Sequence, residues 1–234
     1  MALPVYLEVG PKRTFASAVD WPGWSRGGRD EAAAIGNLVG HGPRYVAALD
    51  GLAIGLRLPR SVADVEVVER LTGGSGTDFG VPSRPATGDE RAVDDPEAGR
   101  LADILRACWD AFDAAASAAI GVELAKGPRG GGRGLDRIVG HVWEADVAYQ
   151  QSLGHPYRPT GGVAPAADMR RLRDSALSAL SSRIAGEPLP PSRRTSEPWS
   201  PRSYVRRAAW HALDHAWEIE DRARQPAEGM CAGW

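Results

Sequence analysis

The chain has 234 residues, 43% of them hydrophobic and 25% charged, so it is long enough to bury one large core or two small ones. Its formal net charge of -2 gives no reason to expect a nucleic-acid partner. No stretch comes near the roughly 20 consecutive apolar residues that cross a bilayer, and the cysteines fit reduced thiols, so we expect a cytoplasmic protein without a membrane partner.

The first 71 residues predict a small α+β module. Two strands are expected over Leu3 to Val9 and Arg13 to Val19, separated by a Gly-Pro turn. After a tight Trp-Pro-Gly-Trp turn at residues 21–24, apolar residues recur at helical spacing from Asp30 to Leu49. A third strand is expected over Val65 to Leu71. This order of elements is typical of a sheet covered by one helix.

This module resembles the small HicB-like fold. Members place a Pro-Gly turn after the second strand, then a glycine and an acidic start to the helix, and here these are Pro22-Gly23, Gly28 and Asp30-Glu31-Ala32. The resemblance implies a β-β-α-β arrangement and a partner-binding role, because many members are antitoxins that bind a small RNase. The chain shows no basic helix-turn-helix segment, so a structural or dimerising module is the other interpretation.

A segment of different composition follows at residues 72–95. It is rich in glycine up to Thr77, carries Pro82 and Pro85, and ends in an acidic run through Asp95. Because so little of it is apolar, we predict a linker between two domains, residues 1–71 and 96–234.

The second domain predicts four helices. They are expected over Pro96 to Val122, Gly134 to Leu153, Ala164 to Ala185 and Pro198 to Arg224, with glycine- and proline-rich breaks between them. The first carries apolar residues at spacings of three and four. Four helices with short connections predict an all-α four-helix bundle, and the chain as a whole belongs to the α+β class.

Three histidines on two of these helices are candidate ligands of one metal ion. His211 and His215 are four residues apart, about one helical turn, so both imidazoles leave the same face of the last helix. They lie at the edge of its apolar face, and His141 has the same position on the second bundle helix. Alanines beside each histidine leave room for an ion and a substrate. Three imidazoles with open coordination positions are typical of a catalytic metal, and Zn, Ni or Fe all suit them.

The bundle resembles the DinB/YfiT-like superfamily of metal-binding four-helix bundles. Members carry one histidine in the second helix and an H-x-x-x-H pair in the last, which His141, His211 and His215 match in order and helix placement. The resemblance implies a divalent metal. It also implies a low-molecular-weight thiol as cosubstrate, because the family includes thiol-dependent S-transferases and an isomerase.

Two other side chains are candidate catalytic residues. Glu218 follows His215 by three residues and can orient an imidazole or act as a base, although a surface ion pair with Arg222 explains it equally well. Tyr204, two turns before His211, can line the pocket.

The remaining polar candidates are weaker. Glu144 follows a histidine by three residues but is expected at the surface. His41 and His155 are expected as solvent-facing loop residues. Arg206 and Arg207 attract an anionic substrate or lie on a solvated face.

Two functions of different classes follow from these patterns. The first is a metal-dependent enzyme that activates a thiol or water to act on a small-molecule substrate, as a transferase or hydrolase. The alternative is a non-catalytic, partner-binding or antitoxin-like regulatory protein whose metal is structural or vestigial. The open edges of a small sheet would also allow a homodimer.

Overall fold

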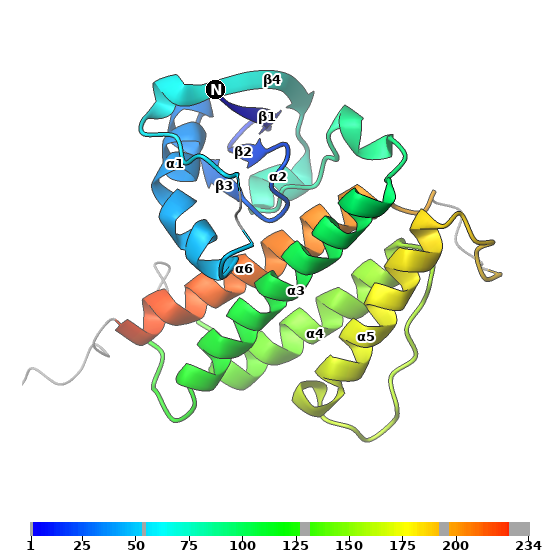
Figure 1. The fold of residues 1–234 in the computed structure, drawn as a ribbon. Helices are drawn as coiled ribbons and strands as arrows, with labels where there is room; N and C mark the ends of the chain where they lie inside the picture. Colours follow the sequence, from blue (N-terminus) through cyan, green and yellow to red (C-terminus); the bar gives the residue numbers. More distant parts are fainter. Residues whose placement is uncertain (1, 53–54, 127–131, 192–196, 225–234) are drawn as a thin grey trace, which may run out of the picture. The chain divides into compact units, whose positions relative to one another are not determined.

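A computed structural model describes residues 2–52, 55–126, 132–191 and 197–224. Within them the chain is a mixed α+β protein, a small sheet followed by long helices, as the sequence predicts (Figure 1). The strands are β1 (Leu3–Val9), β2 (Thr14–Ala18), β3 (Ser25–Gly28) and β4 (Val65–Thr72). The helices are α1 (Glu31–Ala48), α2 (Ser75–Phe79), α3 (Asp95–Ala118), α4 (Leu135–Ser152), α5 (Pro165–Ile184) and α6 (Pro201–Arg224), with short 3-10 turns η1 (Val62–Asp64) and η2 (Thr87–Glu90).

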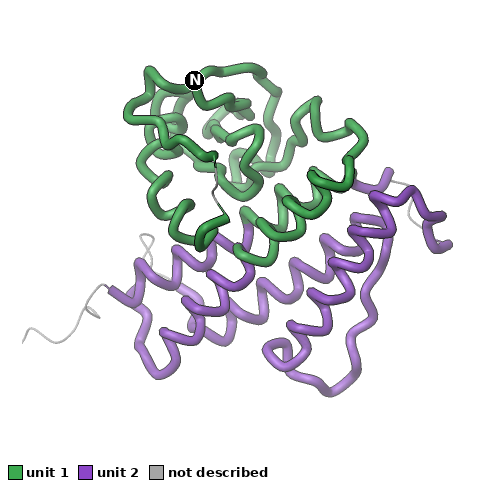
Figure 2. Tube along the Cα trace, in the orientation of Figure 1, with its two compact units in different colours: residues 1–107, 200–210 green, residues 108–199, 211–234 purple. Residues whose placement is uncertain are grey.

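Contacts within the chain define two compact units (Figure 2). Unit 1 comprises residues 1–107 and 200–210, and unit 2 comprises residues 108–199 and 211–234. The helices α3 and α6 therefore contribute residues to both units. These units divide the chain differently from the predicted domains 1–71 and 96–234, and separate folding of those two domains stays a prediction.

The sheet of unit 1 has the strand order β3-β2-β1-β4. β1 pairs antiparallel with β2 and parallel with β4, and β2 pairs antiparallel with β3. The edge strand β4 shifts register opposite Val5 and Tyr6, an irregularity of the kind that blunts an edge against pairing with another chain. The predicted strands and helix are confirmed to within two residues at each end, and β3 is an additional strand.

The Pro-Gly turn explains why β3 exists. Trp24 N donates to Trp21 O over 3.1 Å, and Gly23 has a φ of 93°, the left-handed conformation that the third position of a type II turn requires. The chain reverses and pairs with β2. Because β3 reads Ser-Arg-Gly-Gly, it carries no apolar alternation, so its pairing comes from the turn and not from a strand pattern.

Helix α1 lies against the sheet despite its glycines and Pro43 (Figure 1). Asp30 caps its first turn by accepting from Ala33 N over 2.8 Å. Two buried polar contacts hold it in place: Tyr45 Oη donates to a backbone carbonyl of the turn over 2.8 Å, and Trp24 Nε1 donates to Leu38 O over 2.9 Å. A Cβ at Gly42 would come within 3.0 Å of the Trp24 ring, so glycine permits this close approach.

A buried carboxylate helps to bind the stretch predicted as a linker, residues 72–95, to the sheet. Glu8 on β1 is fully buried and accepts from Ser83 N at 2.8 Å, Ser83 Oγ at 3.0 Å and Arg84 N at 3.0 Å. It also accepts from the Thr77 hydroxyl of α2. The segment has few apolar residues, as its composition indicates, and hydrogen bonds hold it to the sheet.

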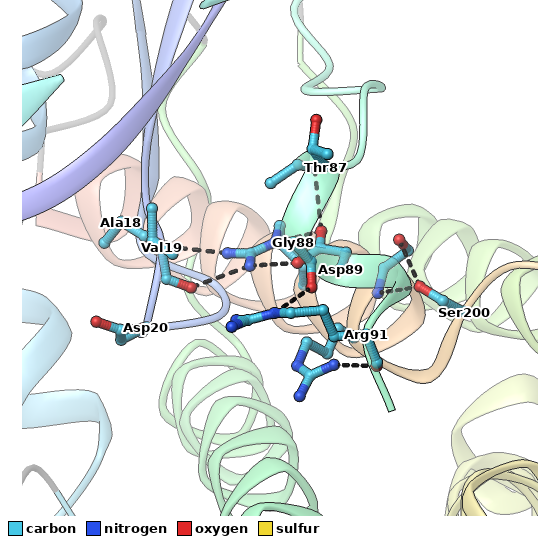
Figure 3. Close-up of polar contacts among 12 residues, drawn as sticks. Ala18, Val19, Asp20, Thr87, Gly88, Asp89, Arg91 and Ser200 are labelled. Atoms are coloured by element: carbon cyan, nitrogen blue, oxygen red, sulfur yellow. Dashed lines mark hydrogen bonds and ion pairs between the residues drawn. The ribbon is translucent and has the colours of Figure 1, made fainter. Parts of the chain in front are cut away.

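Arginines of the first half of α6 complete unit 1. Arg206 donates to both carboxylate oxygens of Asp89, at 2.7 and 3.0 Å, and to the carbonyls of Ala18 and Val19 (Figure 3). Arg207 donates to Pro82 O over 2.8 Å. Arg206 is buried, so its guanidinium stabilises this unit and is not on a solvated face.

Unit 2 holds α4 and α5, which lie side by side, with the second halves of α3 and α6 (Figure 1). The helices predicted for the second domain are confirmed to within four residues at each end. Each contributes fully buried apolar side chains, including Phe112, Val142, Leu172 and Ile219. None of the described helices is long and apolar enough to cross a membrane.

Candidate metal centre

Three histidines of unit 2 come together as the sequence predicts. His141 on α4 and His211 on α6 bring their Nε2 atoms to 3.3 Å from each other. One ring nitrogen from each of His141, His211 and His215 lies within 4.8 Å of the other two. The rings meet edge to face, with centroids 4.6 to 5.1 Å apart. Among the described residues this is the one group of three or more potential ligands that lie close enough to hold a metal ion.

The nitrogen spacing fits a divalent ion. Zn–N bonds of about 2.0–2.1 Å in a tetrahedral site set the nitrogens about 3.3–3.4 Å apart. The His141–His211 separation already has that value, and the remaining nitrogen must move by about 1.5 Å at most, since no pair exceeds 4.8 Å. A histidine rotamer adjustment covers such a distance. His141, His211 and His215 are therefore a donor set suited to a metal with at least one further coordination position.

Helix geometry and small neighbours create the cluster. The four-residue spacing puts His211 and His215 on one face of α6, with Ala208 and Ala212 fully buried beside them. Tyr149, two turns after His141 on α4, places its ring edge-on to His211 at 5.5 Å. His211 is buried, and the side chain of His215 is 13% exposed, so the centre lies at the rim of the core.

Burial also sets the protonation of His141. Desolvation lowers the pKa of this imidazole, and the positive charge of Arg133 and the neighbouring His215 lower it further. The neutral ring is the form that binds metals, so this environment favours ligation at neutral pH.

Glu218 makes both of the contacts that the sequence allows for it. Its Oε2 accepts from His215 Nδ1 over 2.8 Å, and its Oε1 accepts from Arg222 Nη1 over 2.8 Å. The hydrogen bond from His215 is the main cause that lowers the pKa of Glu218. The carboxylate both orients the imidazole and pairs with the arginine, and it leaves Nε2 of His215 as the nitrogen for a metal.

The other candidate residues lie elsewhere. Tyr204 is fully buried in unit 1, two turns before His211 on α6, about 10 Å along the axis. Glu144 is exposed, as expected. The prediction that His41 lies in a loop is wrong, because it lies within α1, where its Nδ1 is 2.9 Å from Asn37 O. His155 follows the turn at Leu153 and Gly154 after α4, and the expectation that it faces solvent is wrong because it is half-buried.

One buried carboxyl group of unit 2 was not singled out by sequence. Asp146 on α4 is buried, and neither oxygen has a hydrogen-bond partner among the described residues. Burial raises its pKa to about 7, although the charge of Arg173 lowers it. Arg173 itself donates to Asp113 over 2.6 Å, and its Nε and Nη2 are buried without partners among the described residues. The signal in the sequence is that Asp146 shares the helix face of the buried Val142.

No protein-family model, curated protein or solved structure matches this chain. The geometry of the histidines and their neighbours is therefore what supports a function.

Proposed function

We propose that the protein is a divalent-metal-dependent enzyme whose ion is held by His141, His211 and His215. The observation that carries the proposal is the meeting of three ring nitrogens, from helices α4 and α6, within 4.8 Å of one another. Such an approach brings three imidazoles together at the rim of a core, and imidazole is the commonest metal ligand among side chains.

Zn, Ni and Fe all suit three imidazoles, and any of them would lower the pKa of a thiol or water that binds in an open position, producing a nucleophile at neutral pH. In this chain Glu218 holds the ring of His215 through Nδ1. The lowered pKa of Glu218 suits this positioning role, and its use as a base stays a prediction. A role for Tyr204 in catalysis stays a prediction.

The proposal includes the two family resemblances. A DinB-like bundle accounts for the order of the histidines along the helices and would make a low-molecular-weight thiol the cosubstrate. A HicB-like module accounts for the Pro-Gly turn and the capped helix α1 that follows it. The chain would then act as a thiol transferase or hydrolase on a small molecule.

The alternative is a partner-binding or antitoxin-like protein whose metal is structural or vestigial. The two functions differ in what His211→Ala does. In an enzyme the variant loses turnover and stays folded. In a protein with a structural ion the melting temperature falls on metal removal, and no turnover exists to lose.

The test is a thiol-dependent activity screen on the metal-loaded full chain. Protein loaded with Zn, Ni or Fe is incubated with a low-molecular-weight thiol and a panel of electrophiles, and with esters and amides in the absence of thiol. We expect turnover that His211→Ala lowers by more than about 100-fold, because a ligand of the ion is lost. The control is His41→Ala, which removes a histidine of α1. Equal rates for wild type and His211→Ala across the panel would overturn the enzyme proposal.

A further inference from the structure

Helix α6 carries two glutamate–arginine pairs at the same spacing but in different surroundings. Glu218 and Arg222 are four residues apart with a 2.8 Å contact, and Glu220 and Arg224 are four residues apart with a 3.3 Å contact. The Arg222 side chain is 7% exposed, whereas that of Arg224 is 68% exposed. An exposed pair of this kind contributes little, because water screens it. The ion pair with Glu218 therefore does not explain why Arg222 is buried.

Arg222 is held from two sides within unit 2. Its Nε donates to the carbonyl of Ala125 over 2.7 Å while its Nη1 donates to Glu218 over 2.8 Å. A backbone hydrogen bond joins the same two residues, since Ala125 N donates to Arg222 O over 3.0 Å. A guanidinium has donors in a rigid planar fork, so fixing Nε fixes the direction of Nη1 as well. The connection after α3 thus determines where Glu218 can place its carboxylate.

We infer that Arg222 is a positioning residue for the metal centre: anchored on the Ala125 carbonyl, it holds Glu218 so that His215 presents Nε2 to the ion. The inference rests on the proposed metal centre and assigns a function to a residue outside the ligand set. Within the described part of the chain, each oxygen of Glu218 has one partner, Arg222 on Oε1 and His215 on Oε2. Removing the first partner frees the carboxylate to rotate, and the Nδ1 tautomer of His215 loses its fixed acceptor.

A purely structural role for Arg222 makes a different prediction. If the residue only ties Ala125 to α6, its removal lowers stability without changing the tautomer of His215 or the affinity of the centre. The tautomer is a direct readout, because ring nitrogens that carry a proton and those that do not differ in their ¹⁵N chemical shift. It can be measured in the metal-free full chain.

The experiment compares Arg222→Met and Glu218→Gln with the matched control variants Arg224→Met and Glu220→Gln. Zn²⁺ affinity is measured by calorimetry, and the His215 tautomer by ¹⁵N NMR of the side chain. We expect both test variants to weaken Zn²⁺ binding by about 10- to 100-fold and to abolish the single Nδ1–H tautomer. The double variant should bind Zn²⁺ no more weakly than the single variant with the lower affinity, because the two residues act in one chain of contacts. The controls should bind as wild type does.

Unchanged affinity, within about twofold, and an unchanged tautomer in Arg222→Met would overturn the inference. If that variant does not fold, Arg222→Lys carries the test, since lysine keeps the charge but lacks the fork that serves both acceptors. Failure of the metal proposal looks different: wild-type protein would then bind no Zn²⁺, while the tautomer comparison would still report whether Arg222 fixes His215.

Discussion

His215 and Asp146 are both titratable residues of unit 2, and their surroundings give them opposite properties. His215 has a carboxylate partner at 2.8 Å, whereas Asp146 is buried with no hydrogen-bond partner among the described residues. A buried carboxyl without partners favours its neutral form. The Nδ1 atom of His215 is thus held by a carboxylate, whereas Asp146 keeps its proton at pH values below its pKa of about 7.

The raised pKa of Asp146 predicts that its contribution to the free energy of unfolding falls as pH rises. Its pKa in the folded chain is about 7, above that of an unfolded aspartate, so the folded state binds the proton more tightly. This contribution is fully present below about pH 4 and is lost as pH rises through 7. The charged groups that act on it are Arg173, which opposes the shift, and Asp113, which adds to it.

Asp146→Asn should remove that pH dependence. We compare the free energy of unfolding of the variant with that of the wild type at each pH. This difference should be more favourable to the variant at pH 8 than at pH 4 by on the order of 2–4 kcal/mol, since one pKa unit corresponds to about 1.4 kcal/mol. Urea unfolding at the two pH values, followed by tryptophan fluorescence, measures this. Asp174→Asn, at an exposed position of α5, is the control. An Asp146→Asn effect that is equal at both pH values would contradict the assignment.

The histidine positions could be predicted from sequence because they depend on spacing within helices. The partners of Glu218 and Arg222 could be predicted only in part. The i,i+4 pair follows from helix geometry, but the bond from Arg222 to Ala125 joins residues 97 positions apart. No periodicity signals such a contact.

Among the elements, the segment after β4 shows how a polar stretch is fixed. Its composition indicates a linker, yet Glu8 of β1 binds Ser83, Arg84 and Thr77 through a fully buried carboxylate. Sequence identifies Glu8 only as one residue of a strand, and it is buried because both faces of β1 are covered. The helices were easier to predict, because their apolar stripes repeat over many turns.

Glu8→Gln should loosen residues 77–84 without unfolding the sheet. The amide keeps the size of the side chain but replaces one acceptor oxygen with a donor, so at least one of the backbone or hydroxyl donors loses its partner. We expect a loss of about 1–3 kcal/mol and faster hydrogen exchange at the Ser83 and Arg84 amides. Glu66→Gln, at an exposed position of β4, should change neither. Unchanged exchange at both amides in Glu8→Gln would show that the carboxylate does not hold this segment.

For the whole molecule, contacts distant in sequence decide which residues form a unit. Arg206 and Asp89 are 117 residues apart and bind through two hydrogen bonds. Such pairs place residues 200–210 with unit 1, although composition groups all of α6 with the later helices. The α+β class follows from element order alone, whereas the division into units depends on buried polar pairs that no local pattern indicates.

The most direct test of the metal centre is the metal content of the intact chain. Native mass spectrometry of the full chain, purified and then loaded with Zn²⁺, measures bound ions and oligomeric state together. We predict one ion for each wild-type chain, loss of the ion when His141, His211 and His215 are all replaced by alanine, and retention in His155→Ala. No bound ion in the wild type, or an equal content in the triple variant, would contradict the account.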